Sequence, residues 1–65
     1  MLRHEDELDV RSLIGLAPGE AKEIAERYGY TVRVVGPGGA VTADLRVGRV
    51  NLTTDGTRVT EAWFG

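Results

Sequence analysis

Apolar and charged positions alternate with a helical period over residues 18–28. Four apolar residues lie at i, i+3, i+4 and i+7, on one face of such a helix: Ala21, Ile24, Ala25 and Tyr28. Pro18 suits the first helical position, because the N–H that it lacks would have no partner there. Gly29 provides a left-handed stop. The pattern therefore predicts one amphipathic helix that begins at Pro18 and ends before Gly29.

Three later stretches alternate with a period of two, which is typical of half-buried strands: residues 30–35, 49–53 and 58–63. In the second stretch, Val50 and Leu52 are predicted to point inward, whereas Arg49 and Asn51 are predicted to point outward. Asp55-Gly56 predicts a hairpin between the second and third stretches.

The third stretch predicts that Val59 shares a face with Glu61. Together the elements predict an α+β domain, a single helix packed on a small mixed sheet. The expected core contains Leu13, Ile14, Leu16, Ile24, Tyr28, Val32, Val34, Val50, Leu52 and Val59. Trp63 and Phe64 are expected to pack as a lid at the C-terminal end, the alternative being an exposed patch for a partner.

Two segments stand outside this pattern. Residues 1–11 are rich in acidic side chains and predict a flexible arm before a single domain at 12–65. Residues 36–48 are long for a simple connection in so small a chain. Glycines and Pro37 bound this segment, while its middle favours an extended backbone, so it is typical of a presented peptide.

Composition narrows the chemistry. The chain has 65 residues, no cysteine, one histidine and a formal net charge of -2. Disulfides and thiolate zinc sites are therefore excluded, and we expect no metal and no cofactor. There is no basic surface for nucleic acid and no apolar run long enough to span a membrane. The compartment stays open, either cytoplasmic or secreted with a leader removed.

Catalysis has little support in the sequence. His4 lies in the predicted arm, and Ser12 is the only serine, so the usual pairing of a nucleophile with a base has no candidate. The glycines at 36–39 lack the lysine and the following helix of a phosphate-binding loop. The sequence therefore predicts a protein that is not an enzyme.

Three stretches carry a family resemblance: Leu13-Ile14-Gly15, Glu20-Ala21-Lys22 and the run from Val41 to Val50. The last reads V-T-x-acid-x-R-x-x-R-V, which is the most specific part. Over residues 12–65 the chain resembles the potato inhibitor type I family of serine-protease inhibitors, which includes the barley chymotrypsin inhibitor and eglin. The resemblance implies a disulfide-free α+β fold with a long, extended reactive-site loop that a protease binds like a substrate.

The resemblance also implies a site. The reactive-site loop would span residues 38–47, with the scissile bond between Ala43 and Asp44. The residues expected to contact the protease are Ala40, Val41, Thr42, Ala43, Asp44, Leu45 and Arg46. Arg49 matches an arginine that braces the loop through Thr42 and Asp44, and Asn51 stands where plant members have a second one. We expect both Arg49 and Asn51 to support the loop.

The small side chain of Ala43 favours subtilisin-like or elastase-like enzymes as partners, because it would fill a deep aromatic pocket poorly. We expect the inhibitor to act as a monomer. The alternative is a small non-enzymatic binding or scaffold module that docks through this loop or through Trp63 and Phe64.

Overall fold

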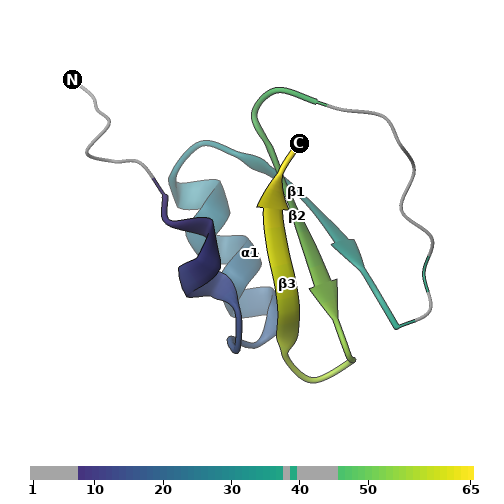
Figure 1. Cartoon of the computed structure of the whole chain (residues 1–65). Coiled ribbons are helices and arrows are strands. Elements are labelled where there is room, and N and C mark those ends of the chain that lie inside the picture. The colour runs from purple at the N-terminus through teal and green to yellow at the C-terminus, as the bar shows by residue number, and fades with distance from the viewer. Residues whose placement is uncertain (1–7, 38, 40–45) are drawn as a thin grey trace.

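The structure is a computed structural model that describes residues 8–37, 39 and 46–65. A 3-10 helix, η2 (Val10–Leu13), comes before the α-helix α1 (Pro18–Arg27). Three strands follow, β1 (Thr31–Val35), β2 (Arg49–Thr54) and β3 (Val59–Phe64). Figure 1 shows α1 on one side of a three-stranded sheet. The predicted α+β class, one helix on a small mixed sheet, is confirmed.

The helix α1 begins and ends where the sequence predicts. Ala21 and Ala25 are fully buried on its inner face, while Glu23 and Arg27 form an exposed i,i+4 ion pair at 3.7 Å. The N–H groups of Gly29 and Tyr30 donate to the carbonyls of Glu26 and Ala25, which closes the last turn. Gly29 has a φ of 90°, a conformation that few side chains tolerate, and this accounts for the helix stop.

The sheet order is β1-β2-β3, with β2 in the middle. β1 and β2 are parallel, with Thr31 opposite Arg49 and Arg33 opposite Asn51. β2 and β3 are antiparallel, with Asn51 opposite Trp63. Because β1 and β2 run in the same direction, the connecting chain must return from the end of β1 to the start of β2. This return is made by residues 36–48.

The predicted hairpin joins β2 to β3. The Asp55 carboxylate accepts hydrogen bonds from the backbone N–H groups of Thr57 and Arg58 at 2.8 and 2.9 Å, and these bonds shape the turn. Thr54 pairs with Val59, and Thr53 pairs with Glu61, so Thr60 is an extra residue that forms a bulge. The prediction that Val59 and Glu61 share one face of the strand is therefore wrong, because the bulge interrupts the alternation.

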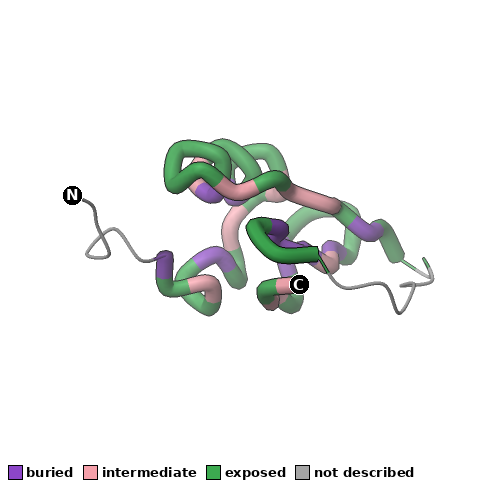
Figure 2. Tube along the Cα trace, turned by 90° about the horizontal axis from the view of Figure 1, so that it is seen from above, coloured by how far each residue is buried: buried purple, intermediate pink, exposed green. Residues whose placement is uncertain are grey.

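The core lies between the helices and the sheet. In Figure 2, buried segments occur in both the helices and the strands. Its buried residues are Leu8, Leu13, Ala21, Ala25, Val50, Leu52 and Val59. Leu16, Ile24 and Val32 pack against this cluster from partly buried positions. Leu8 contributes to the core, so the packed chain begins there rather than at residue 12, and residues 1–7 of the expected arm lie outside the described part.

Three expected core residues are exposed: Ile14, Tyr28 and Val34. Tyr28 is 44% exposed because it follows the last residue of α1, where the chain leaves the helix. Val34 is 42% exposed although it lies on the same face of the strand as Val32. It lies near the end of β1, which is an edge strand of the sheet.

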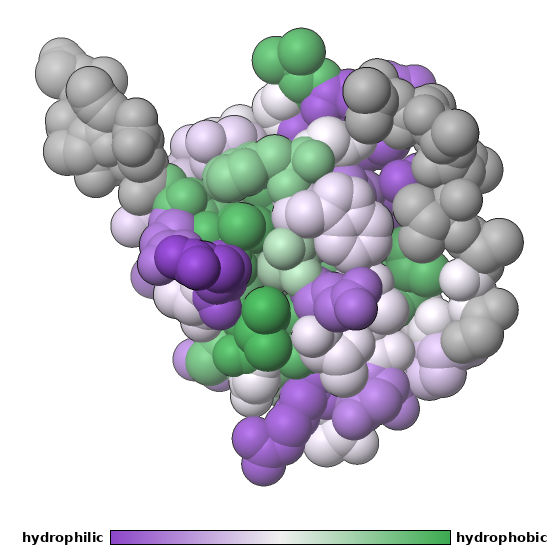
Figure 3. Space-filling view, in the orientation of Figure 1, coloured by the Kyte–Doolittle hydropathy of each residue, from purple (hydrophilic) through white to green (hydrophobic). Residues whose placement is uncertain are grey.

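The segment that joins η2 to α1 runs beside the start of β3. Gly15 N–H donates to the carbonyl of Val59, and Val59 N–H donates to the carbonyl of Leu16, both at 2.8 Å. Figure 3 shows hydrophobic side chains gathered between η2 and β3 on this side of the molecule. In the described part of the chain, no helix is long and apolar enough to cross a membrane.

Candidate functional site

The candidate site is the segment that links β1 to β2, together with the strands on which it ends. Ala40, Val41, Thr42, Ala43, Asp44 and Leu45 of the predicted reactive-site loop lie outside the described residues. Arg46 is the one expected contact residue that the structure describes. The described parts of the site are the two ends of the segment and the strand residues next to them.

At the β1 end, the chain turns at once. Gly39 N–H donates to the carbonyl of Gly36 at 3.0 Å. A Cβ on Gly39 would lie 2.8 Å from Cγ1 of Val35, which is buried at the end of β1. Only glycine fits against Val35 without a shift, so this close approach fixes how the segment leaves the sheet.

At the β2 end, the backbone is fixed to both neighbouring strands. Arg46 N–H donates to the carbonyl of Gly65 at 3.1 Å, just past the end of β3. The carbonyl of Gly48 accepts from Thr31 N–H at 2.9 Å and from the Thr31 hydroxyl at 3.3 Å. Val47, between these anchors, is fully exposed. The last residues of the segment are thus held to β1 on one side and to the C-terminal end of β3 on the other.

The Arg49 side chain bonds to the same backbone oxygen as Arg46 N–H. Its Nη2 donates to the carbonyl oxygen of Gly65 at 2.8 Å, and Gly65 N–H donates back to the carbonyl of Arg49 at 2.9 Å. Gly65 O therefore accepts from both Arg46 and Arg49. Arg49 is only 8% exposed. Arg49 lies on the face opposite to the core residues Val50 and Leu52, as predicted, but it is buried there rather than exposed to solvent.

Asn51 lies on the same face as Arg49, as predicted, and it is 0% exposed. It lies between Arg33 on β1 and Trp63 on β3, and these large neighbours account for its burial. Its Oδ1 accepts a hydrogen bond from Arg33 Nε at 2.9 Å. Because a guanidinium only donates, this contact fixes which end of the amide is the oxygen.

The pairing places two guanidinium groups on one face of the sheet. Arg33 lies opposite Asn51, and Arg49 lies opposite Thr31, so the two arginines are diagonal neighbours on adjacent strands. Glu61 on β3 lies opposite Thr53 on the same face, so this face carries both arginines and one acidic residue. In the sequence, Asp44 is the only acidic residue between Glu26 and Asp55.

The sequence prediction missed Arg33 and Gly65. Arg33 was predicted to lie on the opposite face from Val32 and Val34. Its contact with Asn51, however, depends on the parallel register of β1 and β2. No local pattern gives that register. The role of Gly65 rests on backbone atoms alone, and these leave no signal in the residue types.

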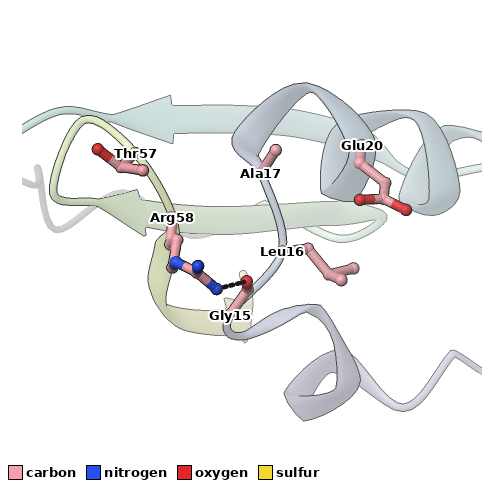
Figure 4. A pocket seen from close by; sticks show the side chains of 6 residues that line it. All are labelled: Gly15, Leu16, Ala17, Glu20, Thr57 and Arg58. Atoms are coloured by element: carbon pink, nitrogen blue, oxygen red, sulfur yellow. Dashed lines mark hydrogen bonds between the residues drawn. The ribbon is translucent and has the colours of Figure 1, made fainter.

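Two surface hollows are of note among the residues that the structure describes. Figure 4 shows the first, about 370 Å³, in which Arg58 Nη1 donates to the carbonyl of Gly15 at 3.3 Å beside the start of α1. The second, about 390 Å³, lies next to the β2 end of the segment. Its lining comprises Arg46, Val47, Gly48, Phe64 and Gly65. Phe64 is 47% exposed, so the expected lid packs only in part. The centroid of its ring lies 5.3 Å from the centroid of the Tyr30 ring.

Comparison of the chain with protein-family models, with curated proteins and with solved structures found no match. Among the residues that the structure describes, no group of three or more His, Cys, Asp or Glu side chains could hold a metal ion.

Proposed function

We propose that this protein inhibits serine endopeptidases by presenting residues 38–47 as a substrate-like loop. Ala43 would enter the specificity pocket of the protease, Val41 and Thr42 would precede it, and the bond to Asp44 would be the one attacked. Subtilisin-like or elastase-like enzymes are the proposed targets, because both accept a small side chain at this position. The proposal rests first on the family resemblance of the sequence.

One observation carries the structural support: Gly65 O accepts hydrogen bonds from both Arg46 N–H and the Arg49 guanidinium. These bonds attach the β2 end of the proposed loop to β3, at a position two residues after Asp44. A loop that is already held near its bound form loses less entropy when a protease binds, and it releases cleaved ends more slowly. Such anchoring is what an inhibitor needs and what a mere connection does not.

The chemistry of Arg49 agrees with this proposal. A guanidinium has five N–H donors in a planar fork, so it can bond to Gly65 and still donate to other acceptors. Thr42 and Asp44 are the proposed acceptors, one on each side of the scissile bond. The burial of Arg49 strengthens such charge-assisted hydrogen bonds, because water competes less for them.

Titration of subtilisin and of pancreatic elastase with the purified protein tests the proposal. We expect stoichiometric loss of activity at micromolar concentration or below. The Ala43→Arg variant should lose potency against elastase and gain it against trypsin, since residue 43 would set the specificity. The control is Arg27→Gln, at an exposed position in the last turn of α1. It should leave the inhibition of both enzymes unchanged. Full protease activity at a molar excess of protein would refute the inhibitor proposal.

A second candidate is a protein-binding module without inhibitory activity. The exposure of Val47 and Phe64 around the second hollow favours it, because large apolar side chains gathered at a surface are typical of docking sites. The Ala43→Arg variant separates the two candidates. A docking site at Val47 and Phe64 predicts no protease preference that follows residue 43.

A further inference from the structure

The turn between β2 and β3 contains the one Asp-Gly pair of the chain, Asp55-Gly56, and the sequence has no Asn-Gly pair. Both residues are exposed. Asp-Gly pairs in exposed turns are chemically labile, because glycine has no side chain to hinder attack of its backbone nitrogen on the preceding carboxyl group. This turn is therefore the place where the chain is most open to isoaspartate formation.

Isoaspartate forms in two steps. The backbone nitrogen of Gly56 attacks Cγ of the protonated Asp55 carboxyl, so that a C–N bond forms, a C–O bond breaks, and the hydroxyl leaves as water with the amide proton. Solvent water then opens the resulting succinimide ring, and opening at the backbone carbonyl leaves the chain linked through the Asp55 side chain. The first step therefore needs a neutral carboxyl group and a backbone nitrogen that is free to approach it.

The contacts of the Asp55 carboxyl oppose this step. Its Oδ1 accepts hydrogen bonds from the backbone N–H groups of Thr57 at 2.8 Å and Arg58 at 2.9 Å. The carboxyl group must break both bonds before it can turn toward the nitrogen of Gly56. The N–H groups of Arg58 and then of Thr57 also lower the pKa of the Asp55 carboxyl, because they stabilise its charged form. The charged carboxylate is a poor electrophile.

The attacking nitrogen is held by Thr54. Gly56 N–H donates to Thr54 Oγ1 at 3.0 Å, and the Thr54 hydroxyl donates to the carbonyl of Arg58 at 2.8 Å. Thr54 is only 7% exposed, so one buried hydroxyl joins both sides of the turn, as donor and as acceptor. Arg58 Nη1 donates in turn to the carbonyl of Gly15 at 3.3 Å, which attaches the turn to the segment before α1 (Figure 4).

We propose that the Thr54 hydroxyl protects the Asp55-Gly56 bond from isomerisation, so that isoaspartate forms only when this turn opens. The rate of this modification then follows the local opening of the turn rather than the exposure of the residues. Isoaspartate adds one carbon to the backbone between β2 and β3, which is incompatible with the present pairing of Thr54 with Val59. The inference is independent of protease inhibition.

The test compares the wild type with three variants of the full chain. Thr54→Val removes the hydroxyl and keeps the volume, whereas Thr54→Ser keeps the hydroxyl and removes a methyl group. The control is Thr53→Val, at the neighbouring position of β2, whose hydroxyl takes no part in the bonds of the turn. Each protein is incubated folded at neutral pH, and the wild type is also incubated unfolded in guanidinium chloride. Peptide mapping by mass spectrometry measures isoaspartate at residue 55, and urea unfolding gives the global stability.

We expect isoaspartate to form at least about tenfold more slowly in the folded wild type than in the unfolded chain, because the carboxylate must first lose its hydrogen bonds. Thr54→Val should accelerate the reaction about threefold to tenfold, the range for losing a neutral hydrogen bond. Thr54→Ser and Thr53→Val should stay near the wild-type rate. Hydrogen exchange of the Gly56 amide in the wild type should be slower than in the unfolded chain, and this measurement needs no variant.

Equal rates of isoaspartate formation in the folded and unfolded wild type would overturn the inference, and so would unprotected exchange of the Gly56 amide. A faster reaction in Thr54→Ser than in Thr54→Val would assign the protection to packing of the methyl group instead of the hydroxyl. An acceleration in Thr54→Val that only matches the rise in its globally unfolded fraction would also contradict a local role of Thr54.

Discussion

The backbone of Gly65 and the residue Arg49 are joined by two reciprocal hydrogen bonds. Gly65 O accepts from Arg49 Nη2 at 2.8 Å, and Gly65 N–H donates to the carbonyl of Arg49 at 2.9 Å. The first residue of β2 is thereby attached to the chain just beyond β3. Because β2 begins where the proposed loop ends, the position of this loop end depends on the last residues of the chain.

Replacement of Arg49 by Lys tests this attachment. Lysine keeps the charge but loses the planar fork, so it cannot bond to Gly65 and to the loop in the same geometry. We expect inhibition of subtilisin to weaken about tenfold to a hundredfold. The inhibition constant measures the effect, with Arg27→Lys on the exposed surface of α1 as the control. Equal potency of Arg49→Lys and the wild type would contradict the bracing role.

Replacement of Gly39 by Ala tests the close approach at the start of the segment. The added Cβ would lie 2.8 Å from Val35 Cγ1 and 3.1 Å from the Gly36 carbonyl oxygen, so Val35 or the backbone must shift. We expect a loss of about 1–3 kcal/mol in the free energy of unfolding. Gly36→Ala is the matched control, because a Cβ there meets nothing within 4 Å. Urea unfolding of both variants measures the difference, and equal stabilities would refute the steric argument.

Replacement of Leu52 by Ala tests the position of the core. Leu52 is fully buried on the middle strand, so its truncation leaves a cavity among α1, β1 and β3. We expect a loss of about 2–5 kcal/mol in the free energy of unfolding. Val34→Ala on the neighbouring strand should cost far less, since Val34 is exposed. Thermal and urea unfolding check both values, and a larger loss at Val34 than at Leu52 would contradict the described packing.

Replacement of Asp55 by Asn tests the turn between β2 and β3 through its pH dependence. Backbone hydrogen bonds from Arg58 and then from Thr57 lower the pKa of the Asp55 carboxyl. A carboxyl whose pKa is lower in the folded state stabilises the fold above its unfolded pKa, and this contribution is lost as the pH falls through the folded pKa.

The wild type should therefore be more stable than Asp55→Asn above about pH 4, and the difference should vanish on further acidification. Urea unfolding at a series of pH values measures this difference. An equal difference at neutral and strongly acidic pH would show that the charge of Asp55 does not contribute.

Local patterns in the sequence predict the elements but not their pairing. Pro18 and Gly29 mark both ends of α1, and Asp55-Gly56 marks the hairpin, because each of these residues acts on its own backbone. The burial of Asn51 and its contact with Arg33 depend instead on which strand lies in the middle and on the parallel register. The bulge at Thr60 is a pairing feature as well, and it explains why the predicted face of Val59 and Glu61 was wrong.

The same distinction applies to the candidate site. The residues from Ala40 to Leu45 were predicted from a motif, and they lie outside the described residues. A supporting role for Arg49 was predicted from the same motif, whereas its bond to Gly65 was not, because a backbone carbonyl carries no sequence signal.

We propose that a protease binds residues 38–47 as a slowly cleaved substrate, and mass spectrometry of the protein during incubation with active subtilisin is the sharpest test of this binding mode. We expect one slow cut, between Ala43 and Asp44, while most of the chain stays intact and the enzyme stays inhibited. Rapid cleavage at several bonds within residues 38–47, with subtilisin fully active throughout, would contradict the claim.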